Sequence, residues 1–299
     1  MTGNMIVPLR SLLFVPADSE RKIEKSQGSG ADAIVYDLED SVAQARKDIG
    51  REIVTAHLKA RGPSRTQHWV RINPVTTPEA LPDLASIVAC RPDGILLPKA
   101  ESPEDVWIVS HYLDALEVRE GVAPGSIRII PVTTETARSP LALHEYPDAG
   151  LSRLHGLTWG AEDLSASLGA ASNSDEDGNL TLTYRMARSL MLLAAKGAGV
   201  EAVDGVYPNF RDLEGLRRFC KASQREGFSG CFAIHPDQVA VINEAYSPSA
   251  DDIAFAERVV AAFAASPDVG VVGVEGKMLD KPHLVQAQKV LALRDVFMA

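Results

Sequence analysis

The sequence predicts an α/β fold, a TIM (β/α)8 barrel with a C-terminal helical extension. Three observations support this prediction: eight short apolar runs rich in β-branched residues, segments of helical periodicity between them, and polar residues gathered directly after the runs. Alternation of strands and helices is typical of a parallel sheet. A barrel of about 250 residues with a short extension also fits the 299 residues of the chain.

Each run has the character of a strand that is buried on both faces. Runs such as AIVYDLE and GILLPK are almost continuously hydrophobic, and the segments between runs are long enough for crossover helices. A doubly wound open sheet would produce the same alternation, but eight units with polar residues after the runs favour a closed barrel. In chain order the runs are Ser11–Val15, Ala33–Leu38, His68–Ile72, Gly94–Pro98, Ile127–Val132, Gly156–Trp159, Ala202–Val206 and Cys231–Ile234.

The residues after the eighth run form the extension. We expect a helix near Asp251–Ala265, a hinge in the glycine-rich stretch Gly270–Gly276, and a last helix over Leu284–Phe297. The predicted domains are therefore a catalytic barrel over residues 1–265 and an extension over residues 266–299. The extension is too short to be a separate domain, so it should pack on its own barrel or on a neighbouring one.

Charge and cysteine content limit the classes of function. The formal net charge of −10 argues against nucleic acid as a partner, because phosphate binding needs an excess of Lys and Arg. No run approaches the roughly 18 apolar residues of a membrane span, and Arg10 interrupts the apolar stretch near the start of the chain. Cys90, Cys220 and Cys231 are odd in number and far apart, so we expect a protein of the reducing cytoplasm without disulfides.

Acidic residues follow five of the eight runs, at the strand ends where β/α barrels form their active sites. Glu135 follows the fifth run in PVTTET, and Asp163 follows the sixth in WGAED. Carboxylates on one rim repel each other unless a cation lies among them, and carboxylate oxygens with water form the usual site for Mg²⁺. Acids stabilised at helix starts are the alternative explanation. Two acids on neighbouring strands favour Mg²⁺.

Arg71 ends the third run in WVRINP. An unpaired guanidinium would be costly to bury there, so the side chain must face a carboxylate of the protein or of a ligand. The protein candidates are Asp37, Glu39 and Asp40 on the second strand, and such an acid can orient the arginine while its other edge binds a substrate. Arg10, just before the first run, is a weaker candidate for substrate binding and equally suits the surface.

Three other motifs carry less weight. GSGADA at Gly28–Ala33 precedes its strand, whereas a dinucleotide-binding fingerprint follows one. DEDGN at Asp175–Asn179 lacks the glutamate that completes a calcium loop, so a solvated loop is expected. His235 at the eighth strand end suits a structural role as well as a catalytic one.

A series of longer motifs spans almost the whole chain: RSLLFVP, AIVYDLEDSV, RINP, GILLPKAES, IIPVTTETARS, LTWGAEDLSASLG, DGVYPNFRDLEGL and IHPDQVAVINEAYSPS. Together they resemble the citrate lyase beta-subunit-like branch of the HpcH/HpaI aldolase superfamily. The resemblance implies a β/α barrel that binds Mg²⁺ through the ETAR glutamate and the GAED aspartate, here Glu135 and Asp163. It also implies that the RxN arginine, here Arg71, binds the carboxylate or carbonyl end of the substrate.

The resemblance further implies a site shared between subunits. In malyl-CoA and citramalyl-CoA lyases of this family, a C-terminal segment covers a neighbouring subunit's site and supplies a catalytic aspartate. GKMLDKPH matches that segment and implies Asp280 as this residue, with residues 266–299 as a lid in a homotrimer or hexamer. The chain departs from the family at Thr134, where many relatives have an apolar residue, and before Arg51, which leaves a phosphate role for Lys47 unsupported.

The implied activity is that of a Mg²⁺-dependent carbon–carbon lyase. Its substrate would be a β-hydroxyacyl-CoA thioester of the malyl-CoA, citramalyl-CoA or citryl type. The alternatives are an acyl-CoA thioesterase on the same site, a citrate lyase beta subunit that needs acyl-carrier partners, and a ligand-binding barrel without catalysis. The lid aspartate favours a stand-alone acyl-CoA enzyme, and the joint presence of both metal acids speaks against the non-catalytic barrel.

Overall fold

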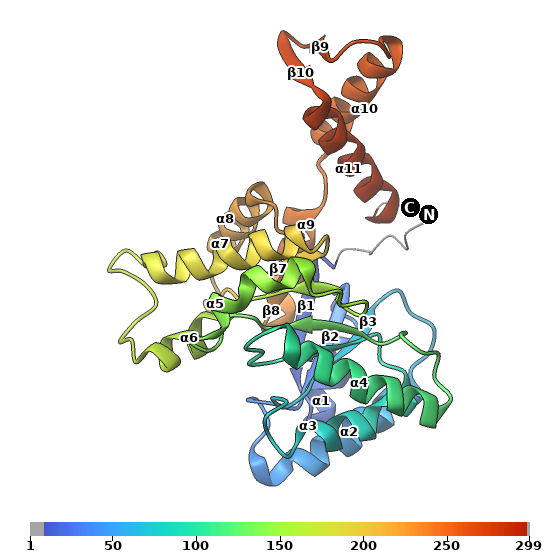
Figure 1. The fold of residues 1–299 in the computed structure, drawn as a ribbon, viewed down its shortest axis with the longest axis vertical. Coiled ribbons are helices and arrows are strands. Elements are labelled where there is room, and N and C mark those ends of the chain that lie inside the picture. Colours follow the sequence, from blue (N-terminus) through green and yellow to red (C-terminus); the bar gives the residue numbers. More distant parts are fainter. Residues whose placement is uncertain (1–8, 298–299) are drawn as a thin grey trace. The chain divides into compact units, whose positions relative to one another are not determined.

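Eight parallel strands lie at the centre of the first unit of the chain, which ends at Asn243, with helices around them (Figure 1). This computed structural model describes residues 9–297. The strand order is β5-β4-β3-β2-β1-β8-β7-β6, and every run predicted as a strand is a strand. The strands are β1 (Ser11–Pro16), β2 (Ala33–Asp37), β3 (Gln67–Arg71), β4 (Gly94–Leu97), β5 (Arg128–Pro131), β6 (Gly156–Leu157), β7 (Glu201–Asp204) and β8 (Gly230–Ala233).

Helices connect the strands, as crossovers between parallel strands require. None of the helices within residues 9–297 combines the length and apolar content needed to cross a membrane. The α-helices of this unit are α1 (Glu20–Ser26), α2 (Lys47–Ala60), α3 (Ala80–Ile87), α4 (Pro103–Glu120), α5 (Ser139–Ala142), α6 (Ala161–Leu168), α7 (Leu182–Gly197), α8 (Leu213–Glu226) and α9 (Pro236–Tyr246), the last of which crosses the unit boundary. Short 3₁₀ helices are η1 (Gln44–Arg46), η2 (Val88–Cys90) and η3 (Leu143–Asp148).

The ring of strands closes at a seam between β5 and β6. Strand β6 has only two residues, so the contacts that close the ring flank it. Val132 pairs in parallel with Thr158, whose N–H donates to the carbonyl of Pro131 at 3.2 Å. The N–H of His155 donates to the carbonyl of Ile129 at 2.9 Å. The predicted barrel is therefore confirmed over the open sheet.

Side chains from alternate strand positions fill the barrel interior. Trp69 is the largest of them, and Gly94 on β4 makes room for its ring, because a Cβ at that glycine would lie 2.2 Å from the indole. Side chains alternate along a strand, so Arg71 shares the interior face of Trp69, one step nearer the carboxyl end. The interior cluster comprises Leu9, Leu12, Ala33, Val35, Trp69, Leu96, Ile130, Val132, Val203 and Phe232, with Phe14 packed against it.

A buried ion pair joins α4 to the segments before β5 and β6. Nη1 and Nη2 of Arg153 donate to the two carboxylate oxygens of Glu117 at 2.8 and 2.6 Å. The same carboxylate accepts the N–H groups of Gly125 at 2.7 Å and Ile127 at 3.1 Å. Both side chains are buried, at 3% and 0% exposure. Hydrogen bonds therefore surround the Glu117 charge.

The second unit, from Glu244 onward, has a core of its own. Helix α10 begins with a capping box between Ser249 and Asp252. The elements are α10 (Ala250–Ala265), β9 (Val271–Val274), β10 (Lys277–Asp280) and α11 (Lys281–Phe297). The buried residues are Ala256, Val259, Phe263, Val272, Val274, Leu279 and Ala287, with Leu284, Val290 and Leu291 packed against them.

The second unit corrects two expectations. It includes α10, so the division falls before the expected boundary at residue 265, because α10 packs on α11 and β9. The glycine-rich stretch is an antiparallel hairpin rather than a hinge. Its turn residues Glu275 and Gly276 have φ values of 50° and 76°, as a two-residue turn of the primed type requires.

Replacing Arg153 by Met should lower the free energy of unfolding of the barrel by about 3–5 kcal/mol, because the Glu117 charge would stay buried without its partner. The matched control Arg119→Met removes an exposed ion pair with Glu120 and should cost less than about 1 kcal/mol. All three tryptophans, Trp69, Trp107 and Trp159, lie in the first unit, so urea unfolding followed by tryptophan fluorescence reports on the barrel. Equal losses in both variants would contradict the prediction.

Candidate functional site

The carboxyl ends of β2 and β3 place an acid beside an arginine. Asp37 and Arg71 are register partners at the ends of their strands. Nε and Nη2 of Arg71 each donate to one oxygen of Asp37 at 2.7 Å, which makes a strong bidentate pair. Burial alone would raise the pKa of Asp37, but the guanidinium holds it below its ordinary value. The structure therefore brings together an arginine and an acid that the sequence singles out.

Arg71 keeps one edge of its guanidinium toward the cavity at the barrel mouth. Its Nη1 lies 3.0 Å from Oε2 of Glu39, an ion pair whose angles fall short of a hydrogen bond. The guanidinium carbon lies 4.8 Å from the centre of the Phe14 ring. A guanidinium has five N–H donors, and the hydrogen bonds to Asp37 use two of them. Because Arg71 also lines the cavity, donors remain for a ligand carboxylate.

Glu135 reaches the same cavity from the loop after β5 and is buried. Its Oε2 accepts the backbone N–H of Lys99 at 2.5 Å. Burial and the nearby Glu39 carboxylate raise the pKa of Glu135 to about 8, with a further upward contribution from Asp163 and an opposing one from the Lys99 N–H. A positive charge placed beside this carboxylate would lower its pKa again and favour the ionised form.

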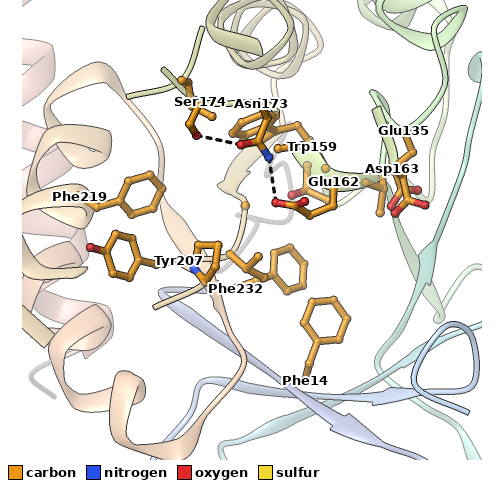
Figure 2. Close-up of a pocket in the computed structure, with 18 of the residues that line it drawn as sticks. Phe14, Glu135, Trp159, Glu162, Asp163, Asn173, Ser174, Tyr207, Phe219 and Phe232 are labelled. Atoms are coloured by element: carbon orange, nitrogen blue, oxygen red, sulfur yellow. Dashed lines mark hydrogen bonds between the residues drawn. The ribbon is translucent and has the colours of Figure 1, made fainter. Parts of the chain in front are cut away.

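Asp163 lies in the first turn of α6, where the helix dipole favours an acid. That position satisfies the alternative explanation for its presence, yet Figure 2 shows Asp163 and Glu135 beside each other. Close approach depends on Gly160, since a Cβ there would lie 3.0 Å from Cγ of Glu135. Thr134 accepts the N–H of Gly160 at 3.1 Å, so this departure from the family pattern fixes the backbone between the two acids.

Lys99 is a cation of the site that the sequence analysis missed. Its Nζ lies 2.5 Å from Oε1 of Glu39, 3.4 Å from Oδ2 of Asp40 and 3.4 Å from Oδ1 of Asp163. Burial would lower the pKa of Lys99, but the contact with Glu39 raises it above its ordinary value. The available signal was its place in GILLPK, directly after a strand, which is the criterion that selected the acids.

A cavity of about 300 Å³ opens beside these charges (Figure 2). The rings of Phe14 and Phe232 stack 4.9 Å apart and give it one apolar side. Trp159, Tyr207 and Phe219 also line it. The cavity therefore combines a charged end with an aromatic remainder, as is usual for small-molecule sites, in which a few polar groups lie among apolar ones.

A buried acid anchors the aromatic wall of the cavity. Nε1 of Trp159 donates to Oδ1 of Asp204 at 2.6 Å. Asp204 is fully buried and forms an ion pair with Arg188 at 2.7 Å. The indole next to the GAED segment is therefore held in one orientation.

A polar flap, residues 172–180, forms another part of the cavity lining. Nδ2 of Asn173 donates to Oε1 of Glu162 at 2.9 Å, and the hydroxyl of Ser174 donates to Oδ1 of Asn173 at 2.8 Å (Figure 2). Asp175 and its neighbours are exposed, as expected of a solvated loop, but Asn173, Ser174 and Leu180 line the cavity. The expectation of a merely solvated loop was therefore incomplete.

The donor set at the charged end suits a hard divalent cation. Glu135 and Asp163 offer carboxylate oxygens from two neighbouring strand ends. Residues 9–297 contain no group of three or more His, Cys, Asp or Glu side chains placed to hold a metal. Mg²⁺ does not need one, because it commonly binds one or two protein carboxylates and completes its octahedron with water and substrate oxygens.

Other predicted site residues lie elsewhere. Arg10 precedes β1 and pairs with Asp32 through two hydrogen bonds of 2.8 and 2.7 Å, at the end of the barrel opposite the cavity, so the structure does not support substrate binding by Arg10. Nζ of Lys47 donates to the carbonyls of Leu38 and Glu39, which gives it a structural role. Asp280 belongs to the second unit.

Known proteins resemble this chain along almost its full length. Residues 10–236 match the family model described as HpcH/HpaI aldolase/citrate lyase. A (3S)-malyl-CoA thioesterase of Cereibacter sphaeroides is 35% identical over 98% of this chain and 96% of its own length. The mitochondrial citramalyl-CoA lyase of Rattus norvegicus is 34% identical over 98% of this chain and 88% of its own length.

A solved structure agrees with these relatives. CitE from Mycobacterium tuberculosis, in complex with magnesium, acetoacetate and coenzyme A, superposes with a TM-score of 0.78 at 33% identity. The match covers 97% of this chain and 100% of that one. With the barrel, the arginine and the paired acids in place, the chain belongs to the HpcH/HpaI aldolase/citrate lyase family.

Proposed function

We propose that this protein is a Mg²⁺-dependent carbon–carbon lyase that cleaves or forms a β-hydroxyacyl-CoA thioester of the malyl, citramalyl or citryl type. The observation that carries the proposal is the convergence of Arg71, Glu135 and Asp163 on one cavity. The names of the relatives and the magnesium and coenzyme A bound by CitE support the choice of metal and substrate class.

Cleavage of such a thioester breaks the bond between its hydroxyl-bearing carbon and its α-carbon. The hydroxyl proton leaves as a carbonyl forms, and the departing enolate takes up a proton on carbon. When bound by Glu135 and Asp163, Mg²⁺ would supply Lewis-acid polarisation at the hydroxyl end of the substrate. Arg71 would bind the carboxylate at that end through its remaining donors, and the aromatic lining would exclude water from the enolate.

Thioester hydrolysis is the second candidate function, because a 35% identical relative is a malyl-CoA thioesterase. The same cavity would then admit a water molecule to the thioester carbonyl. A panel of malyl-, citramalyl- and citryl-CoA incubated with Mg²⁺ separates the two activities. Cleavage yields a keto or aldehyde acid and a shorter acyl-CoA, whereas hydrolysis yields free coenzyme A thiol and the intact hydroxy acid. Absence of both products across the panel would contradict the proposal.

We also propose that Asp280 serves the site of a neighbouring subunit in a homotrimer or hexamer. Asp280 lies where β10 meets α11, and its half-exposed carboxylate contacts Nδ1 of His283 at 2.5 Å. Met278 and Val285 nearby in sequence are 82% and 65% exposed, and a subunit contact would cover such apolar side chains. A closed symmetric assembly would give every site one such aspartate, which can exchange a proton with the enolate carbon.

Glu135→Gln and Asp163→Asn should each weaken Mg²⁺ binding by more than the roughly 10–100-fold that changes around metal ligands cause, because each removes a direct ligand. Isothermal titration with Mg²⁺ measures this. Glu101→Gln is the control. Like the two test acids, Glu101 follows a barrel strand, here β4, but it pairs with Arg138 and does not line the cavity. Unchanged affinity in both test variants would overturn the metal assignment.

Arg71→Lys should lower kcat/KM by about 100-fold. The guanidinium binds both oxygens of Asp37 and still has donors for a ligand, and an ammonium cannot do both. Arg10→Lys makes the same change in the bidentate pair at the other end of the barrel and should leave kcat/KM unchanged. Comparable rates for the two variants would mean that Arg71 has only a structural role. Thermal unfolding of both variants checks that the barrel stays intact.

Asp280→Asn mixed with Glu135→Gln should regain activity that neither variant has alone, because hybrid assemblies contain sites with both groups intact. Subunit exchange is followed by native mass spectrometry on differently tagged chains. A mixture of Asp163→Asn with Glu135→Gln is the control and should stay inactive, since every barrel in it lacks one of the two metal ligands. Proven exchange without recovery would refute a shared site.

A further inference from the structure

Lys99 links residues at the carboxyl ends of four strands, β2, β4, β5 and β6. Its side chain reaches Glu39 after β2 at 2.5 Å and Asp163 after β6 at 3.4 Å, while its backbone N–H binds Glu135 after β5 at 2.5 Å. Lys99 itself follows β4. Both acids proposed as metal ligands therefore touch this one residue, one through its ammonium and one through its backbone.

The ammonium of Lys99 lies where it opposes a second cation. A divalent ion bound to Asp163 would share that carboxylate with a positive charge 3.4 Å away. Unit charges about 4 Å apart still interact by several RT at the effective dielectric of a protein surface, so the two cations compete for the same oxygen. Glu39 and Asp40 offer the ammonium other partners at 2.5 and 3.4 Å.

The backbone of Lys99 is also unusual. Its φ of 51° lies in the left-handed region, which favours glycine over lysine. A glycine would donate the same N–H to Glu135 at lower conformational cost. The presence of a lysine in this conformation indicates that its side chain has a use that offsets the strain.

We propose that Lys99 is a positioning residue, a resident counter-ion that a divalent cation must displace from Asp163 in order to bind. In the metal-free protein the ammonium neutralises the acids and keeps them at the cavity. On metal entry it moves away from Asp163 and keeps its contacts with Glu39 and Asp40. The lysine thereby lowers the affinity for the bare metal, so that the metal binds firmly only with an anionic substrate that adds negative charge. This inference rests on the proposed Mg²⁺ site.

The test is Mg²⁺ titration of the substrate-free protein by calorimetry. Lys99→Met keeps the backbone N–H of residue 99 and an unbranched side chain of similar size but removes the charge, and it should bind Mg²⁺ about tenfold more tightly than the unchanged protein. Lys99→Gln, which keeps a hydrogen-bond donor, should show the same direction and serves if the methionine variant does not fold. A merely structural lysine would give the opposite sign, because its loss would let Asp163 drift away from Glu135.

Arg61→Met is the matched control. Arg61 forms an ion pair with Asp93 at 3.4 Å, the same separation as between Lys99 and Asp163. This pair precedes β3 and β4, so it lies at the end of the barrel opposite the cavity. Its Mg²⁺ affinity should equal that of the unchanged protein. Equal or weaker binding in the Lys99 variants, with binding in the unchanged protein intact, overturns the role of Lys99 alone. Absence of Mg²⁺ binding in the unchanged protein overturns the metal site and this inference together.

Discussion

Repulsion among carboxylates is the constraint around which the mouth of this barrel is arranged. Glu39, Glu135 and Asp163 approach one another in a partly buried place, where each negative charge is costly unless a positive one compensates it. Arg71 and Lys99 supply part of that compensation, while burial and the nearby Glu39 and Asp163 carboxylates still raise the pKa of Glu135. The remaining deficit of positive charge is what makes the cavity a place for a cation.

Contacts within the barrel wall fix the side chains of the site in place. Alternation along β3 aims Arg71 into the interior, and its register with Asp37 fixes the guanidinium before any ligand arrives. Gly160 lets Glu135 approach α6, and Asp204 holds the indole of Trp159 against the cavity. Because these contacts lie within the protein, binding need not order the side chains first, which preserves affinity for a small ligand.

Much of the fold could be predicted because buried parallel strands leave a strong local pattern, and the strand-end rule found Glu135 and Arg71. Lys99 follows a strand too, but its role depends on contacts with Glu39 and Asp163, which are distant in sequence. The structure does not support substrate binding by Arg10, because Arg10 pairs with Asp32 before the second strand, and a sequence does not show which distant residue an arginine meets. The hairpin after α10 was taken for a hinge because glycine suits both.

The two-residue length of β6 has a consequence for local opening of the barrel. Gly156 packs so tightly on β7 that a Cβ would lie 2.8 Å from the carbonyl oxygen of Glu201, whereas the bridges and backbone hydrogen bonds to the β5 side fall on residues that flank β6. Amide hydrogens at this seam, such as that of His155, should therefore exchange with solvent sooner than those of β1 or β2. Asp163 follows the seam and Glu135 follows the strand across it. A ligand that bridges the two acids would link the two sides of this seam and slow that exchange.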